Sequence, residues 1–460
     1  MREYYCSKVS PADNFLQPID LVMLSGTLSG EYEVDVIDAV AGRLTVAAAL
    51  DRIRAIRPDV VISLIGSVSL AEDLQFFREL RASLPIEKLV VSGDVFIEEG
   101  GQLLRENEII DAALLDFTSR DILYYLAGQY ERITRMHIRD KAGVVKTLVT
   151  EGRENVFAVP PPRHELFMKY DYRHALIHGH TFATTIIDFG CPFPCSFCIM
   201  NNLGGYKYRE VDNILAELRV IKKLGIPEIF FHTQTFGANK AVAAELCRRM
   251  IAEKLGFGWV CFSRVDVAAP DLLDLMKAAG CHGIIFGVES GSEKILRLYR
   301  KQYNLKQIMA TTDYCDRIGI ETTGTFILGL PEESHETMRE TLELLKRIKL
   351  DFAGINVAVP RGGTDLRKEA MQKGWVAAGC RTMDQSGTSI AMPTNHLTRE
   401  DLEAYRKKAV STFYFRPSYF MRRLRKIKKS EITKTLKNAA GLIRTTWWPR
   451  DKHAAETSVR

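Results

Sequence analysis

Two successive series of short apolar segments and helical segments most constrain how this chain of 460 residues can fold. In the first series, the apolar segments have the length of β-strands and lie at 19–24, 32–37, 60–64, 89–91 and 110–115. Helical patterns between them include 47–56 and 70–84. This order predicts four or five parallel strands joined by crossover helices, in an open doubly wound α/β domain.

A second series of strands and helices follows a run of prolines, Pro160 to Pro162, which marks a linker. Its expected strands are 185–189, 228–231, 258–262, 283–287, 322–328 and 351–357, and its expected helices include 211–224, 239–253, 271–279 and 334–348. Six strand-helix units predict a partial (β/α)6 barrel, in which the loops after the strands form the active site. We therefore divide this α/β chain into a doubly wound domain at 1–135, a linker with a small ribbon at 136–175, the barrel at 176–370 and a helical, basic region at 371–460.

Small and polar residues follow the expected strands of the first domain. The strand ends carry Asp38, the segment from Ser63 to Ser69, and the segment from Ser92 to Asp94. Ligands of doubly wound sheets bind at the carboxyl ends of the strands, and small residues let a large flat ligand approach the backbone. The first domain is therefore expected to bind a ligand at this edge.

The composition indicates a folded cytoplasmic protein. Hydrophobic residues make up 46% of the chain and the formal net charge is only +6, which argues against disorder and against nucleic acid as a partner. The N-terminus does not resemble a signal peptide, and no stretch of about 18 apolar residues predicts a membrane span. Three of the nine cysteines crowd together and six are scattered, which indicates metal binding in a reducing compartment and not a disulfide framework.

The clustered cysteines are Cys191, Cys195 and Cys198, directly after the first expected barrel strand. Pro192 and Pro194 keep this loop from becoming helical, so three thiolates can converge on one point. A structural zinc site normally has four protein ligands, whereas three cysteines suit a cubic iron-sulfur cluster with one open iron. The alternatives are a structural metal clip and three core cysteines that are close by chance.

The Cys-x3-Cys-x2-Cys motif, with the aromatic Phe197 before its last cysteine, resembles the radical S-adenosylmethionine (SAM) superfamily. The resemblance implies that Cys191, Cys195 and Cys198 hold a 4Fe-4S cluster whose open iron binds SAM. It also implies one-electron cleavage of SAM to methionine and a 5'-deoxyadenosyl radical, with an external flavodoxin- or ferredoxin-type reductant. Phe197 is then a cofactor contact.

Later loops extend this resemblance along the barrel. Arg264 resembles the arginine that pairs with the SAM carboxylate, and Glu289 with Ser290 resembles the segment over the nucleoside. The loops at 326–331 and 360–366 resemble further barrel loops of these enzymes. After the second strand an acidic residue is expected, but the chain carries His232 and Gln234, so Gln234 is the candidate for the SAM ammonium group. Taken singly, a loop or a buried arginine of this kind more often serves packing or an ordinary ion pair, and the order of these motifs after the cysteines is what favours the functional interpretation.

The first domain resembles the flavodoxin-like cobalamin-binding domain of the cobalamin-dependent radical SAM class. The expected contacts are Ser63, Gly66, Ser67, Ser69 and Gly93. The first histidine of the chain is His137, so this domain has no histidine in the position that ligates cobalt in many cobalamin proteins. Both a bound cobalamin with an open lower face and an empty vestigial domain agree with this pattern.

The resemblance implies a cobalamin-dependent methyltransferase that acts on an unactivated carbon of a small or lipid-like metabolite. One alternative is a radical cyclase or oxidoreductase of the same architecture, acting on a tetrapyrrole or a lipid. A non-catalytic protein that binds an iron-sulfur cluster or cobalamin is the alternative from another class.

The C-terminal region is helical and basic, with an apolar stripe that includes Phe420 and Met421 and a basic run that begins at Arg422 and Arg423. Trp447 and Trp448 follow. This region is expected either to pack over the barrel with a solvated basic face or to contact an anionic membrane surface.

Overall fold

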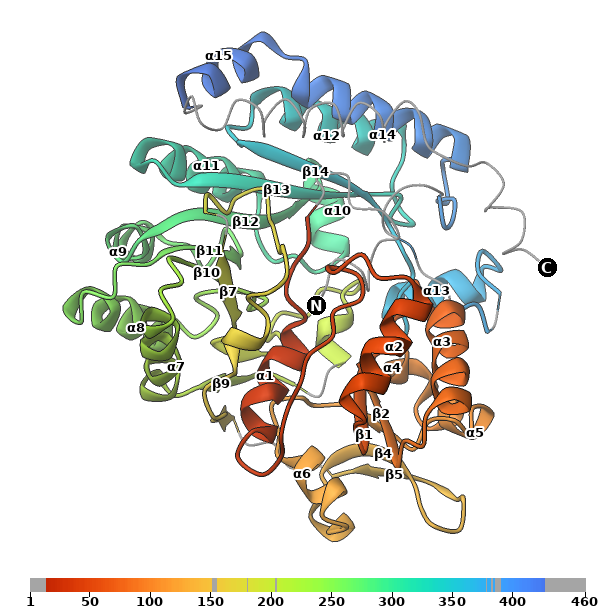
Figure 1. Cartoon of the computed structure of the whole chain (residues 1–460). Helices are drawn as coiled ribbons and strands as arrows, with labels where there is room; N and C mark the ends of the chain where they lie inside the picture. Colours follow the sequence, from red (N-terminus) through yellow and green to blue (C-terminus); the bar gives the residue numbers. More distant parts are fainter. Residues whose placement is uncertain are drawn as a thin grey trace.

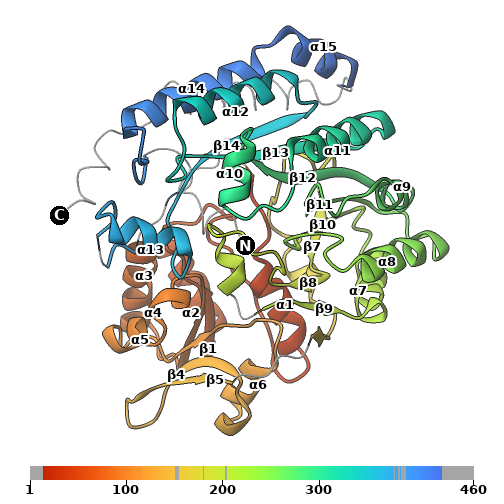
Figure 2. The same cartoon turned by 180° about the vertical axis from the view of Figure 1, so that it is seen from behind.

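The computed structural model describes residues 14–150, 155–179, 181–202, 205–377, 379–381, 384 and 390–426. They form an α/β fold with a five-stranded sheet, a six-stranded parallel sheet and a small three-stranded sheet (Figure 1). The six-stranded sheet and its helices curve around one side of the molecule, and the five-stranded sheet and its helices lie on the other side (Figures 1 and 2).

The five-stranded sheet has the order β1-β2-β3-β4-β5, in which β1 to β3 are parallel and the last two pairs are antiparallel. Its strands are β1 Val60–Leu64, β2 Lys88–Ser92, β3 Ala112–Leu114, β4 Arg135–Arg139 and β5 Val145–Val149. Its helices are α2 Val46–Ile56, α3 Leu70–Ser83, α4 Phe96–Glu99, α5 Gln102–Glu106 and α6 Asp121–Leu126, followed by η2 Tyr130–Arg132. The strands expected at 60–64, 89–91 and 110–115 are confirmed. The antiparallel strands β4 and β5 continue the sheet to Val149, where the sequence predicted a small ribbon within 136–175.

The strand expected at 19–24 is wrong, because these residues belong to helix α1, Ile19–Leu28. Nearly every residue of α1 is buried: Ile19 and Val22 pack with Phe182 of the barrel, and Leu24 packs on the first sheet. A helix buried on all sides is apolar on all sides, so its sequence looks like that of a buried strand. The apolar run therefore indicates correctly that residues 19–24 are buried, but it does not distinguish a buried helix from a buried strand.

The strand expected at 32–37 is also wrong, since this segment pairs with no strand among the residues that the structure describes. A side chain supplies the hydrogen bonds instead: the Tyr170 hydroxyl donates to Val36 O at 3.0 Å and accepts from Asp38 N at 2.9 Å. The alternating apolar pattern of 32–37 is typical of a strand, but here a tyrosine side chain, and not a neighbouring strand, bonds to the backbone.

The six-stranded sheet has the order β14-β13-β12-β11-β10-β7, with all pairs parallel, which agrees with six expected parallel strands. The strand expected at 185–189 is shifted, because the first strand ends at Thr185 and Asp188–Phe189 pair in the small sheet instead. Its strands are β7 Phe182–Thr185, β10 Glu228–Phe231, β11 Gly258–Ser263, β12 Cys281–Glu289, β13 Glu321–Leu328 and β14 Phe352–Val357. Its helices are α7 Val211–Lys223, α8 Lys240–Ala252, α9 Pro270–Ala278, α10 Glu293–Leu298, α11 Leu305–Ile318, α12 His335–Arg347 and α13 Asp365–Gln372. The largest apolar core lies between the outer face of this sheet and its helices.

The small sheet, β6-β9-β8, joins the linker to the segment that carries the cysteines. Its strands are β6 Val156–Phe157, β8 Asp188–Phe189 and β9 Lys207–Arg209, and short turns η3 His164–Leu166 and η4 Ile199–Asn202 lie near it in sequence. The linker packs tightly on α1, because a Cβ at Gly26 would overlap the carbonyl oxygen of Pro160. Glycine at position 26 therefore lets the linker approach α1.

The C-terminal helices α14 Arg399–Tyr414 and α15 Pro417–Lys426 lie over α12 and the β14 edge of the barrel (Figure 1). Arg422 Nη2 lies 3.4 Å from Asp351 Oδ1, and Arg423 Nη1 lies 3.4 Å from Glu321 Oε1. The basic side chains that begin the expected cationic run therefore pair with barrel carboxylates. Trp447 and Trp448 lie outside the described residues.

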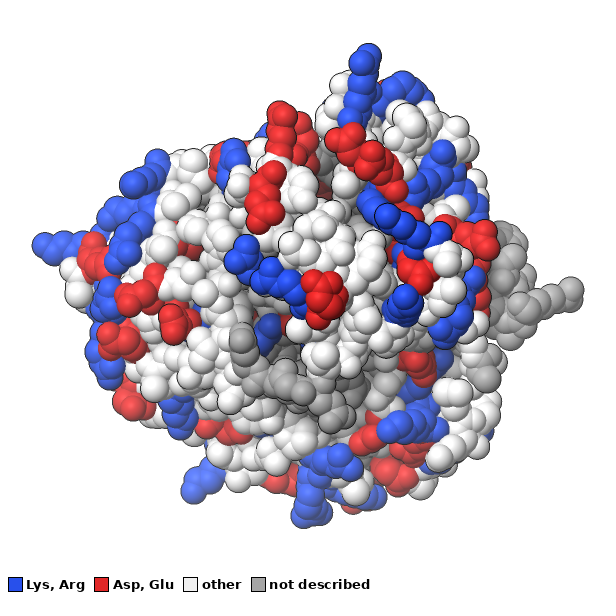
Figure 3. Space-filling model, turned by 90° about the horizontal axis from the view of Figure 1, so that it is seen from below, with Lys and Arg blue, Asp and Glu red and all other residues white. Residues whose placement is uncertain are grey.

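No helix in the described part of the chain is both long and apolar enough to cross a bilayer. On the face shown in Figure 3, Lys and Arg lie interspersed with Asp and Glu. Where charges of opposite sign are interspersed, their electrostatic fields largely cancel, and salt screens what is left beyond about one Debye length, roughly 10 Å.

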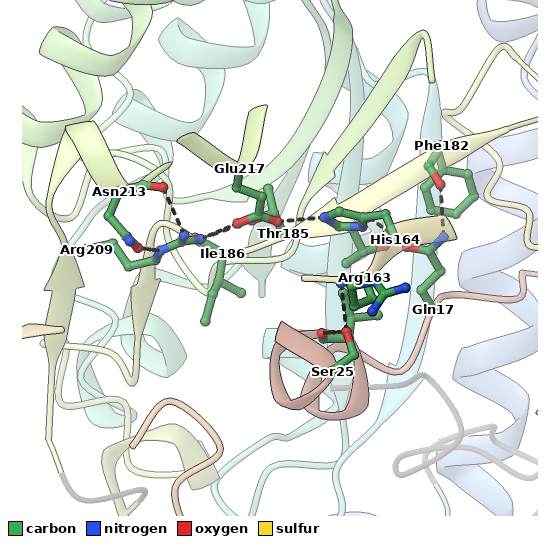
Figure 4. A network of polar contacts seen from close by, with 12 residues as sticks. Gln17, Ser25, Arg163, His164, Phe182, Thr185, Ile186, Arg209, Asn213 and Glu217 are labelled. Atoms are coloured by element: carbon green, nitrogen blue, oxygen red, sulfur yellow. Dashed lines mark hydrogen bonds and ion pairs between the residues drawn. The ribbon is translucent and has the colours of Figure 1, made fainter. Parts of the chain in front are cut away.

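A buried ionic network fastens the linker and the small sheet to the barrel (Figure 4). Glu217 of α7 accepts from Arg209 Nη1 at 2.6 Å and lies 2.9 Å from His164 Nε2, and all three side chains are almost fully buried. Arg209 also donates to the carbonyl of Ile186, after β7, at 3.0 Å. Burial alone would raise the pKa of Glu217, but the charge of Arg209 and the hydrogen bond with His164 lower it to about 2.

We expect Glu217→Gln to lower the free energy of unfolding by about 3–5 kcal/mol, because Arg209 would remain as a buried charge without its anion. The folded pKa of Glu217 lies below its usual value of 4.5. Its stabilisation is therefore present above about pH 4.5 and is lost as the pH falls toward 2. Denaturant titrations from pH 7 to pH 3 should show a weaker acid dependence in the variant.

The control is Glu245→Gln, which removes the partner of Arg248 in an exposed ion pair. Such pairs contribute about 1 kcal/mol or less. Equal effects of the two substitutions would contradict the role given to the buried network.

Candidate functional site

The three clustered cysteines lie on the loop after β8 and line one cavity of about 450 Å³. Gly190, directly before the first of them, has a φ of +79°, and a Cβ there would overlap the carbonyl oxygen of Gly205. The amide of Cys198 donates to Cys195 O at 3.1 Å, which forms a turn. The glycine and this turn bring Cys191, Cys195 and Cys198 to the same cavity, as the sequence predicted.

The donor set of this cavity fits an iron-sulfur cluster. Burial raises the pKa of Cys191, and raises that of Cys198 to about 12, so thiolates here need a bound cation to balance them. Among the described residues, no three His, Cys, Asp or Glu side chains are arranged around a single metal ion. A cubic cluster places its ligand sulfurs farther apart than one ion does, because iron and sulfide atoms stand between them.

Two cations lie beside the cysteines. Arg264, directly after β11, has Nη1 3.5 Å from Cys195 Sγ and donates from Nη2 to Lys301 O at 2.6 Å. Its guanidinium stacks on the ring of Phe193, 3.8 Å from the centroid, and pairs with Asp266 at 2.9 Å. Although burial would lower it, the pKa of Arg264 is raised by the bond to Asp266. The guanidinium is thus fixed beside Cys195.

Lys301 is the second cation, and sequence reasoning missed it. Its Nζ lies 3.0 Å from Glu289 Oε1, and both side chains are about nine-tenths buried. Burial would lower the pKa of Lys301, but Glu289 raises it, so the lysine is charged. A single lysine in a loop after a short helix carries no sequence signal, and only the fold brings it to Glu289.

The backbone around this ion pair is strained. Glu289, Arg300 and Gln302 have φ values of +66°, +58° and +61°, in the left-handed region that non-glycine residues rarely adopt. A register shift between Gly287 and Glu289 at the end of β12 turns the carboxylate toward Lys301. Such conformations persist where the surrounding contacts enforce them, and they concentrate at functional sites.

The remaining residues that were expected to contact SAM lie in different surroundings. Phe197 packs with Leu330 and Leu366 beside the cavity, and Gln234 is half-buried after β10. His232 is buried between the rings of Phe230 and Phe262. Ser290 is fully buried, and its hydroxyl contacts Thr341 of α12 at 3.2 Å. These placements leave the roles of Phe197, Gln234, Glu289 and Ser290 in binding SAM as predictions.

The expected cobalamin contacts lie at the carboxyl edge of the first sheet, where several are held by internal hydrogen bonds. Ser67 donates from its amide and its hydroxyl to Asp94, at 3.0 and 2.9 Å, and the amide of Gly66 donates to Asp73 at 3.1 Å. A Cβ at Gly93 would overlap the carbonyl oxygen of Ile65. Ser63 is half-buried in β1, while Ser69 donates to Asp73 and Asp38 accepts from Tyr172. The contacts to cobalamin stay a prediction.

Other residues that the sequence did not single out also line the cysteine cavity. They are Phe193, Ser196, Gly205, Tyr206 and Arg300, and the segment from Gly363 to Asp365, which the sequence did indicate, lines it too. Tyr206 donates to Asp188 Oδ2 at 3.2 Å, and burial raises the pKa of Asp188 well above its usual value. The segment at 363–365 falls within the predicted barrel loop at 360–366.

A buried carboxyl group holds the loop after β13 beside the cavity. Glu333 Oε2 accepts from the amides of Gly329 and Leu330 at 2.6 and 3.0 Å, and Leu330 packs against Phe197. Its other oxygen, Oε1, has no hydrogen-bond partner among the described residues. Burial raises the pKa of Glu333 to about 8, so the group is largely protonated at neutral pH.

The folded state therefore binds one more proton than the unfolded state between the usual pKa of 4.5 and about 8. Stability from this group is present below about pH 4.5 and is lost as the pH rises through 8. We expect the free energy of unfolding to fall from pH 5 to pH 8, by on the order of 1 kcal/mol or more, and Glu333→Gln to flatten this fall.

The glutamine keeps an oxygen acceptor for both amides but has no proton to lose. Glu332→Gln, at the neighbouring, partly exposed position, should keep the wild-type pH dependence. Parallel stability curves for Glu333→Gln and the wild type would contradict the assignment.

Comparisons with known proteins agree with this site. Residues 185–345 match the model of the Radical SAM superfamily. The chain is 27% identical over 417 residues to the uncharacterised methyltransferase PH0819 of Pyrococcus horikoshii. This alignment covers 88% of this chain and 89% of that protein.

Two solved structures share the fold. One is the radical SAM methyltransferase TsrM from Kitasatospora setae with cobalamin and a [4Fe-4S] cluster, with a TM-score of 0.64, 17% identity and coverage of 82% of this chain and 81% of that chain. The other is the cobalamin-dependent SAM radical enzyme OxsB with aqua-cobalamin and SAM, with a TM-score of 0.68, 16% identity and coverage of 94% and 68%. The matched segment 185–345 contains all three cluster cysteines, Arg264, Glu289 and Lys301, so the similarity to the Radical SAM superfamily extends over the residues around the cysteine cavity.

Proposed function

We propose that this chain is a cobalamin-dependent radical SAM methyltransferase that acts on an unactivated carbon of a small or lipid-like metabolite. The observation that carries the proposal is the cavity that Cys191, Cys195 and Cys198 share, with Arg264 beside Cys195. The similarity to PH0819, which is described as a methyltransferase, extends over most of both chains and favours methyl transfer.

Each part of the cavity has a proposed task. The three cysteines would hold a 4Fe-4S cluster. Arg264, whose Nε and Nη2 donate to Asp266, would orient the SAM carboxylate through Nη1, which lies beside Cys195. Lys301 pairs with Glu289 and would orient this carboxylate to accept hydrogen bonds from ribose hydroxyls. Phe197, Gln234 and Ser290 complete the proposed SAM contacts. An external one-electron reductant of the flavodoxin or ferredoxin type would supply the electron.

The first sheet is the proposed cobalamin site, with Ser63, Gly66, Ser67 and Gly93 at its edge. This edge faces the barrel, because Asp94 beside Ser67 reaches Arg361 of the barrel loop that continues into the cavity wall. A ligand at this edge would therefore lie next to the SAM site. When bound, the cluster and cobalamin would supply one-electron cleavage of SAM and a transferable methyl group.

The test is anaerobic purification with hydroxocobalamin supplied, for the wild type and for the triple variant Cys191→Ala/Cys195→Ala/Cys198→Ala. We expect about four irons and one cobalt per wild-type chain, and the loss of nearly all iron in the triple variant. With SAM and dithionite, only the wild type should release 5'-deoxyadenosine, because the variant has no cluster to donate the electron.

The matched control is Cys380→Ala, a half-buried cysteine outside the cavity, which should keep wild-type iron. Iron without cobalt would refute the dependence on cobalamin. 5'-Deoxyadenosine without a methylated product in cells that supply the substrate would favour the cyclase or oxidoreductase. A cluster that never cleaves SAM would favour a non-catalytic binding protein.

A further inference from the structure

The segment at residues 361–367, here called the coupling segment, connects β14 with the first turn of α13. Gly363, Thr364 and Asp365 line the cavity together with the cysteines. The amide of Leu366 donates to the carbonyl of Ser196, between Cys195 and Cys198, at 3.3 Å. One side of the coupling segment is therefore part of the wall of the cluster cavity.

The other side of this segment contacts the first sheet. Arg361 Nη1 lies 3.4 Å from Asp94 Oδ2, and the two side chains are only 5% and 6% exposed. The same carboxylate accepts two hydrogen bonds from Ser67. Arg367 donates from Nε to Glu98 of α4 at 3.0 Å. Two buried arginines thus fasten the coupling segment to the loop after β2 and to α4.

The backbone of this segment fits closely against the N-terminal domain. A Cβ at Gly362 would lie 2.9 Å from the Cβ of Glu98, so only glycine lets α4 approach this closely. Gly363 has a φ of +76°, and the Thr364 hydroxyl donates back to Arg361 O at 2.7 Å. Figures 1 and 2 both show α13 beside α3 and α4. The conformation of the cavity wall therefore depends on the contact with the first domain.

We propose that Arg361 is a positioning residue through which Asp94 of the first domain orders the coupling segment, so that this domain completes the SAM site. The proposal rests on the proposed function of the cysteine cavity. It assigns the first domain a task that does not require cobalamin. Without Asp94, Arg361 would be a buried cation that has lost an anionic partner, and the segment would shift to expose it.

The test compares Asp94→Asn with Glu106→Gln in the full-length chain, purified anaerobically and reconstituted with iron and sulfide in the absence of cobalamin. Both substitutions replace a carboxylate by its amide. Each weakens one ion pair between the first domain and the rest of the chain, since Glu106 lies 2.8 Å from Arg381. Of these two carboxylates, Asp94 contacts the coupling segment and Glu106 does not. Iron content, Tm, and SAM affinity from the change in the EPR spectrum of the reduced cluster are measured.

We expect Asp94→Asn to keep wild-type iron but to weaken SAM binding about tenfold, a coupling of ordinary size between two sites. Glu106→Gln should bind SAM as the wild type does. Arg361→Gln should reproduce the loss, and the double variant Asp94→Asn/Arg361→Gln should be no weaker than either single variant. Arg361→Lys keeps the charge and should retain part of the affinity, which also provides a test if Asp94→Asn does not fold.

Unchanged SAM affinity in both Asp94→Asn and Arg361→Gln would overturn the inference while leaving the proposed function intact. Loss of iron in proportion to a lower Tm would also overturn it, because the ion pair would then be only structural. A wild-type cluster whose spectrum does not respond to SAM would overturn the proposed function, and the inference with it.

Discussion

The parallel alignment of the six barrel strands is the constraint on which the rest of the structure depends. Parallel strands present their carboxyl ends at one edge, so the loops that follow them meet although they are distant in sequence. The cysteines lie on the connection that follows β7 and includes the short strand β8, Arg264 follows β11, Glu289 ends β12 and the coupling segment follows β14. The cavity is therefore a product of strand order, and no single loop contains it.

Buried ion pairs fix the orientation of the charged side chains at this edge. Arg264 pairs with Asp266, Lys301 with Glu289 and Arg361 with Asp94, and all of these side chains are more than four-fifths buried. Replacing a buried ion pair by apolar residues is often neutral or stabilising, so such pairs are weak evidence of stability alone. Here each pair fixes the direction of a cation at the cysteine cavity or next to it. Their positions are better explained by orientation than by the energy that they contribute.

The sequence predicted the barrel strands and the cysteine loop well, because both carry local signals. Strands such as β10 and β11 are short and largely apolar, and the cysteine spacing is a local pattern. Helix α1 and the segment at 32–37 were predicted wrongly for a common reason: their partners are distant in sequence. The apolar surface of α1 is buried by two different sheets, and the backbone of Val36 and Asp38 is satisfied by Tyr170.

The same limit applies to the site. Lys301 could not be found from sequence, since its role depends on Glu289, which a register shift at the end of β12 turns toward it. Ser290, the next residue, was predicted beside it, yet its side chain is buried against α12. A motif can therefore name the correct loop and still include a residue that serves packing. The coupling segment shows the converse case: two glycines and an arginine in a loop acquire a defined conformation only because a second domain lies against them. The cavity that a radical SAM motif marks is therefore shaped by residues outside the barrel, such as Asp94 and Glu98, which no barrel motif contains.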